Sequence, residues 1–107
     1  MSGRFYMVTF DLKNAASRVA CYKNVEHLLI DRFGQTNYWK LAKQCCIIRT
    51  SVDARFIMNI MNGYLSSTGV SARHHNILVV RLRRGHAFKI DDAALRGVAR
   101  SVLCQIP

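Results

Sequence analysis

The stretch that most constrains the fold is Arg4 to Asn14, RFYMVTFDLKN, because it predicts a strand with apolar residues on both sides. Side chains in a strand alternate between two faces, which here carry Tyr6, Val8, Phe10 and Leu12 on one side and Phe5, Met7, Thr9 and Asp11 on the other. Such a strand belongs inside a sheet that is covered on both faces. Asp11 is the exception, because burying an unpaired carboxylate costs several kcal/mol. An exposed turn and a functional acid both explain it.

The length and charge of the chain narrow its class. We expect one domain, residues 1–107, because this length provides one core and is too short for two. Sixteen Lys and Arg against six Asp and Glu give a formal net charge of +10. This excess favours polyanionic partners, nucleic acid before an acidic membrane surface. No apolar run approaches the ~20 residues of a membrane span, and no signal-peptide pattern begins the chain, so we expect a cytoplasmic protein.

The four cysteines fit a reducing compartment. Cys21, Cys45, Cys46 and Cys104 show no CxxC spacing, and free, buried thiols are usual in the cytosol. The adjacent pair His74-His75 lacks the separation of zinc ligands. We therefore expect neither disulfides nor structural zinc.

Periodicity predicts an α+β domain. After the first strand we expect a helix from Asn14 or Ser17 to about Phe33, and then an extended stretch from Tyr38 to Arg49 whose first half is a turn or an edge. A capping box at residues 50–53 precedes a helix from about Val52 to Leu65. A strand Ile77 to Arg83, a short strand Ala87 to Ile90 and a helix from Asp91-Asp92 to about Leu103 complete the chain. Two βα units with few strands predict a ferredoxin-like split βαβ sandwich, an antiparallel sheet with helices on one face plus a C-terminal helix.

The other face of that sheet predicts a partner. It would carry Phe5, Met7 and either Val79 or its neighbours. An open apolar face in a small domain is usually an interaction surface. We therefore expect a homodimer.

Two short motifs resemble a known family. The first strand ends in F-D-L, and the second ends in I-I-R-T, residues 47–50, before a capped helix. Together with Trp39 and the strand Ile77 to Leu82, they look like the small CRISPR-associated ferredoxin-like nuclease family in its broad sense, which includes the virulence-associated protein D toxins and, most similar here, the SinR-like proteins. The resemblance covers about residues 5–82.

The resemblance implies a homodimer in which the aspartate that ends the first strand faces its symmetry mate across a cleft. In this sequence that residue is Asp11, implied as the catalytic residue and as the Mg²⁺ ligand. Members of the family are metal-dependent endoribonucleases or deoxyribonucleases, and others bind nucleic acid as scaffolds. This sequence departs from the SinR-like pattern at two positions, with Gln44 in place of a serine and Asn76 in place of an aspartate.

Three functions follow as alternatives. The first is a homodimeric Mg²⁺-dependent endonuclease that acts on RNA rather than DNA, with Asp11 at the metal and phosphates held by Lys13, Asn14, Arg81, Arg83 and Arg84. The second is a non-catalytic dimer whose basic residues bind nucleic acid. The third is an interaction protein of the toxin–antitoxin type, whose charge binds an acidic protein partner.

Overall fold

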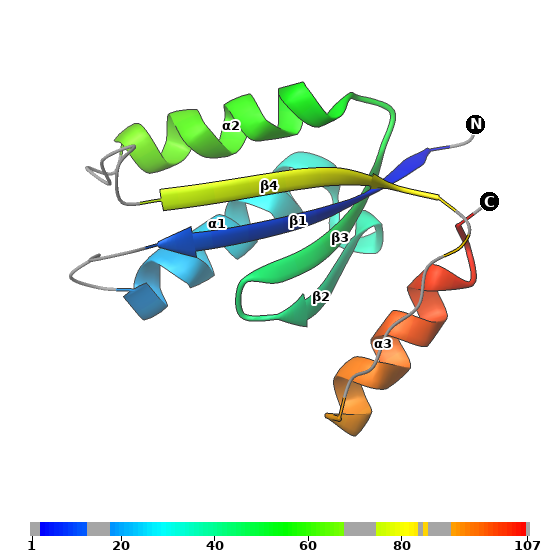
Figure 1. Ribbon diagram of the computed structural model, residues 1–107. Coiled ribbons are helices and arrows are strands. Elements are labelled where there is room, and N and C mark those ends of the chain that lie inside the picture. Colours follow the sequence, from blue (N-terminus) through cyan, green and yellow to red (C-terminus); the bar gives the residue numbers. More distant parts are fainter. Residues whose placement is uncertain (1–2, 13–17, 68–74, 84, 86–90, 107) are drawn as a thin grey trace.

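The computed structural model describes residues 3–12, 18–67, 75–83, 85 and 91–106, with the backbone alone at residues 12, 18–21 and 75. The elements are β1 (Arg4–Leu12), α1 (Arg18–Phe33), the 3-10 turn η1 (Gln35–Asn37), β2 (Tyr38–Ala42), β3 (Cys45–Thr50), α2 (Ala54–Ser67), β4 (His75–Leu82) and α3 (Ala93–Leu103) (Figure 1). None of the described helices has the length and apolar character needed to cross a membrane.

The described strands form one antiparallel sheet in the order β2-β3-β1-β4. The apolar strand β1 is an inner strand, as its composition predicts. It pairs with β3, where Met7 lies opposite Ile47, and with β4, where Asp11 lies opposite Asn76. The fold is therefore α+β with a four-stranded antiparallel sheet, which is compatible with the ferredoxin-like arrangement.

The extended stretch predicted from Tyr38 to Arg49 is two strands joined by a tight turn. Lys43 and Gln44 form the turn between β2 and β3, and the pairing shifts register between Lys40 and Ala42. The first half is an edge strand, one of the two expected forms. Polar residues at positions 43 and 44 favour the turn because they would otherwise interrupt an apolar inner strand.

The hydrogen bonds at the start of α2 differ from those of the predicted capping box at residues 50–53. Thr50 Oγ1 accepts a hydrogen bond from Val52 N at 3.3 Å, outside the helix. Asp53 Oδ1 accepts from Phe56 N at 2.9 Å and so caps the helix itself. The helix therefore starts at Ala54, two residues later than predicted.

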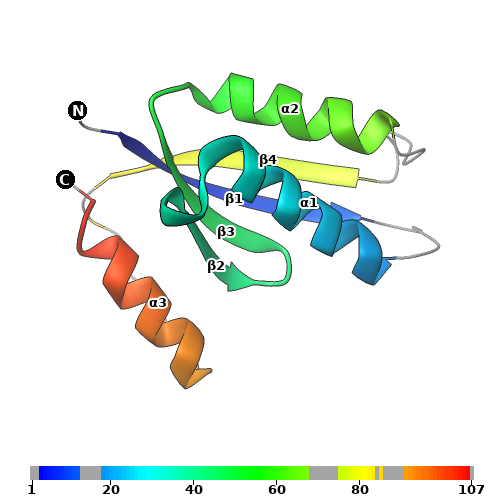
Figure 2. The ribbon, with the colours of Figure 1, turned by 180° about the vertical axis from the view of Figure 1, so that it is seen from behind.

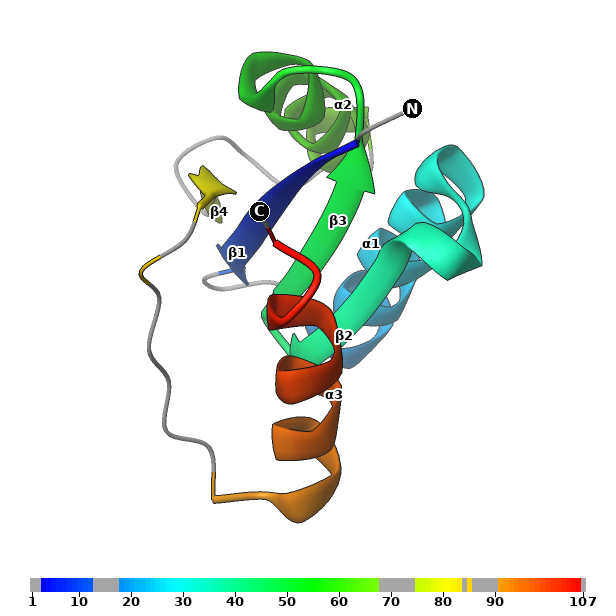
Figure 3. The same ribbon diagram turned by 90° about the vertical axis from the view of Figure 1, so that its right-hand side faces the viewer.

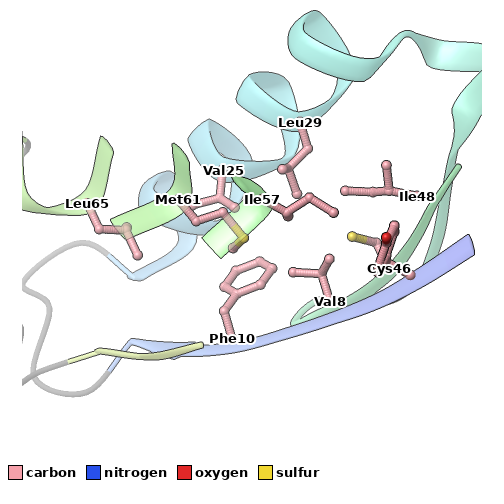
Figure 4. Close-up of a cluster of buried hydrophobic side chains, with 10 residues drawn as sticks. Val8, Phe10, Val25, Leu29, Cys46, Ile48, Ile57, Met61 and Leu65 are labelled. Carbon is pink, nitrogen blue, oxygen red and sulfur yellow. The ribbon is translucent and has the colours of Figure 1, made fainter. Parts of the chain in front are cut away.

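The first face of the sheet is covered by α1 and α2, as predicted (Figure 2). Side chains from both helices pack on the inner strands β1 and β3 in one cluster, shown in Figure 4: Tyr6, Val8, Phe10, Val25, Leu29, Cys46, Ile48, Ile57, Met61 and Leu65. Burial of each large side chain stabilises the fold by about 1.5–3 kcal/mol. This cluster is the main core.

The C-terminal helix α3 lies on the opposite face (Figure 3). Ala99, Val102 and Leu103 pack with Ile106 against Phe5 and Ile47, with Trp39, Leu41 and Leu82 at the margin. The helix begins at its predicted acids, where Asp92 Oδ1 accepts from Leu95 N at 3.0 Å. The strand predicted over residues 87–90 lies outside the described residues.

Candidate functional site

The helix α3 covers one part of the second face. Another part presents Met7 and Thr9 of β1 beside Leu78 and Val80 of β4. Leu78 is 56% exposed and Val80 is 40% exposed. The register selects the neighbours of Val79 from the two expected alternatives, because Val79 lies opposite Val8 on the helix-covered face and Val80 lies opposite Met7. We call Met7, Thr9, Leu78 and Val80 the open strip.

A hollow of ≈ 430 Å³ adjoins the open strip at the end of β1. Asp11 lines it together with Asn76, its neighbour across the sheet, and Gln44 of the β2–β3 turn. Apolar atoms from Leu78, among others, form the rest of its wall. We call this the Asp11 hollow.

Gln44 is held in place by two contacts. Its backbone oxygen accepts from Phe10 N at 3.0 Å, and its Nε2 donates to the Tyr22 hydroxyl at 2.9 Å. Tyr22 in turn packs on Phe10, with 5.6 Å between the ring centroids. These contacts anchor Gln44 to β1 through its backbone and to α1 through its side-chain amide.

The Asp11 hollow offers one carboxylate and two amide groups. Carboxylate and amide oxygens suit Mg²⁺, which retains several waters and needs few protein ligands. No three His, Cys, Asp or Glu side chains gather into a metal-holding group within the described part of the chain. The groups that line the Asp11 hollow therefore fit Mg²⁺ in kind, with a single carboxylate among them.

The two positions that depart from the family pattern, Gln44 and Asn76, meet Asp11 at this one hollow. They come from a turn and from a strand that are far apart in the sequence. Their proximity depends on strand register, which the sequence alone did not provide.

The predicted phosphate-binding arginines lie elsewhere. Arg81 is exposed, lies opposite Tyr6, and is five residues along β4 from Asn76, a separation of about 17 Å. Arg83, also exposed, lies just beyond the end of β4. The structure therefore does not bring Arg81 or Arg83 to Asp11 within one subunit. Lys13, Asn14 and Arg84 lie outside the described residues.

The thiols near the site are poor nucleophiles. Cys45, Cys46 and Cys104 are free, as expected. Burial raises the pKa of Cys45, which lines the Asp11 hollow. Burial, with a smaller contribution from Cys45, raises the pKa of Cys46 to about 12. Both therefore remain protonated at neutral pH, and thiolate chemistry is disfavoured.

A second hollow, of ≈ 410 Å³, lies at the other end of the sheet. It is lined mainly by polar residues and was not predicted from the sequence. Arg32 of α1 and Arg49 of β3 both line it. The sequence signal was the arginine in I-I-R-T, a charge in an otherwise apolar strand. Its partner on α1 could not be identified because seventeen residues separate the two.

Comparisons of the chain with protein-family models, with curated proteins and with solved structures gave no match.

Proposed function

We propose that the protein is a nucleic-acid-binding homodimer that cleaves phosphodiesters, of RNA before DNA, with Mg²⁺ held by Asp11 of both subunits. The observation that carries this proposal is the position of Asp11. It lines a hollow directly beside the exposed apolar strip of the sheet. A two-fold axis that runs along the strands and buries two open strips against each other would bring two such hollows to one cleft.

The element order supports the fold that the resemblance implies. The chain runs β1-α1-β2-β3-α2-β4 before α3, and β1 lies between β3 and β4. This is the βαββαβ order of ferredoxin-like domains. We therefore propose a ferredoxin-like sandwich with an added C-terminal helix on its second face.

Each side chain has a role in the proposal. Asp11 would bind Mg²⁺, while the amides of Gln44 and Asn76 would accept hydrogen bonds from its waters or ligate it directly. Bound Mg²⁺ polarises a phosphodiester and lowers the pKa of bound water.

Arg81 and Arg83 are further proposed phosphate contacts. Arg81 lies opposite Tyr6, on the helix-covered face of the sheet, so a strand bound at both Asp11 and Arg81 would have to pass around the edge strand β4. Lys13, Asn14 and Arg84 are the remaining proposed phosphate contacts. The net charge of +10 supports binding of a polyanion whether or not the protein cleaves it.

A second candidate is a dimer that binds nucleic acid without cleaving it. The observation in its favour is that the described polar neighbours of Asp11 in the hollow, Gln44 and Asn76, are both uncharged. Binding would then be indifferent to Mg²⁺ and to Asp11. The interaction protein with an acidic partner is the third candidate, and it predicts no binding of nucleic acid at moderate salt.

The test is cleavage of labelled single-stranded RNA and duplex DNA with Mg²⁺, Mn²⁺ or EDTA. We expect Asp11→Asn to lower metal-dependent cleavage to the EDTA level while it keeps nucleic-acid affinity and fold. Asp31→Asn, which changes an exposed carboxylate on α1, is the matched control and should cleave like the wild type.

Two other results would redirect the assignment. Binding without cleavage by wild type and both variants would support the non-catalytic dimer. Absence of binding would point to a protein partner.

A further inference from the structure

We propose that the second hollow is a phosphate-binding site in which Arg32 and Arg49 bind a phosphomonoester dianion. The site is separate from the Asp11 hollow. Arg49 lies opposite Phe5, six residues along β1 from Asp11, a separation of about 20 Å. The proposal does not depend on catalysis at Asp11.

Arg49 is held by its neighbours in a fixed orientation. Its Nε donates to Asn37 Oδ1 at 2.9 Å, and Asn37 Nδ2 donates to Phe33 O at 2.9 Å. The guanidinium carbon lies 5.8 Å from the centroid of the Trp39 ring. With Nε engaged, the two terminal amino groups of the fork remain to bind an anion. Such a fork matches phosphate oxygens in a bidentate manner.

Arg32 supplies the second charge. Its guanidinium carbon lies 5.8 Å from the centroid of the Phe56 ring, so an aromatic face on α2 also supports this cation. Neither arginine forms an ion pair with a described carboxylate; the described ion pair is Lys40 with Glu26. An anion bound in this hollow would be attracted by both guanidinium groups.

The rest of the hollow provides hydroxyl donors and space. Thr50 and Ser51 line it, and Thr50 Oγ1 accepts from Val52 N, which leaves its hydroxyl proton free to donate. Gly3 gives room to the stem of Arg49, because a Cβ at that position would lie 2.6 Å from Arg49 Cγ. A side chain at position 3 would displace the arginine.

The charge of the site indicates the ligand. Two arginines carry two positive charges, and a phosphomonoester carries about −1.5 to −2 near pH 7. A diester within a strand carries a single negative charge. The site therefore fits a phosphomonoester, either inorganic phosphate or the terminal phosphate of a nucleic-acid strand.

The experiment measures affinity for short oligoribonucleotides with a 5′-phosphate, a 3′-phosphate or hydroxyl ends, in EDTA, with inorganic phosphate as competitor. We expect the wild type to bind one phosphorylated form roughly 10-fold more tightly than the hydroxyl form. Arg32→Gln and Arg49→Gln should each abolish this preference. Arg49→Lys should lose most of it, because lysine keeps the charge without the fork.

Arg100→Gln is the matched control, an exposed arginine on α3, and should retain the preference. Thermal unfolding shows whether each variant is folded. If Arg49→Gln is not folded, Arg32→Gln tests the proposal alone, because the side chain of Arg32 is exposed.

Arginine-dependent binding of inorganic phosphate without preference for phosphorylated ends would support the site with free phosphate as its ligand. Equal affinity for all oligonucleotides, with no competition by phosphate, would overturn the proposal. Because the assay is run in EDTA and measures binding alone, its failure is distinguishable from failure of the proposed cleavage at Asp11.

Discussion

Cys46 places an ionisable thiol in the main core, between the sheet and its two covering helices. The side chain is 1% exposed. Burial raises its pKa to about 12, and a hydrogen bond with Tyr38 offsets part of that rise. Burial also raises the pKa of Tyr38. The native state thus holds two weak acids in their protonated forms.

This burial predicts a loss of stability in alkaline solution. An unfolded thiol ionises near its ordinary pKa of 9.0, whereas the folded one ionises near 12. Between these values the unfolded chain binds fewer protons than the native chain. The free energy of unfolding should therefore be at its full value below about pH 9 and fall by up to about 1.4 kcal/mol per pH unit toward pH 12.

Urea unfolding at pH 7 to 11 measures this slope. Cys46→Val, which removes the titrating group and keeps a similar volume, should have a shallower slope than the wild type. Cys104→Ser changes an exposed thiol and should leave the slope unchanged. An unchanged slope in Cys46→Val would assign the pH dependence to Tyr38 and other groups.

Among the helices and strands, α3 is the element whose contribution to the free energy of unfolding is easiest to measure separately. Leu103 is 9% exposed and packs in the cluster that contains Phe5 and Ile47. Leu103→Ala should lower the free energy of unfolding by about 2–5 kcal/mol, measured by urea denaturation. Ser101→Ala, at an exposed position of the same helix, should change it by less than about 0.5 kcal/mol.

The Leu103→Ala variant should also change the fluorescence of the protein. Trp39, the single tryptophan of the chain, lies at the margin of the cluster that α3 covers. Looser packing of α3 should admit water to the indole and shift its emission to the red. A stability loss without any shift would contradict the assignment of α3 to this face.

Local patterns were enough to predict some elements and not others. A run of apolar residues located β1, alternation located β4, and the acids at 91 and 92 located the start of α3. The β2–β3 turn has no glycine or proline to mark it, so its two strands looked like one. The side of the sheet on which α3 lies depends on packing between distant residues, which no local pattern contains.

The candidate site, too, was predicted only in part from the sequence. Asp11 was predicted as a strand-terminal acid, and the structure places it in a hollow. Its separation from Arg81 followed only from the register of β1 with β4. Arg32 and Arg49 were not predicted as a pair, because they meet through packing of α1 beside β3.

For the molecule as a whole, the open strip predicts how two copies would pair. Leu78→Lys would place a charge within the proposed interface and should convert the dimer to a monomer, measured by sedimentation equilibrium. Asn59→Lys adds the same charge at an exposed position on α2 and should leave the dimer intact. A monomeric wild type at all concentrations would contradict the proposed pairing.

The partial cover of the second face has a consequence for regulation. In the proposed homodimer, the two copies pair over the part of that face that α3 leaves open, and each brings a charge of +10. A small contact opposed by like charges gives a weak, reversible association. A polyanion that bridges both copies would offset that repulsion, so its binding and subunit association would strengthen each other by the same factor. The position of one helix would thereby make assembly responsive to the amount of ligand in the cell.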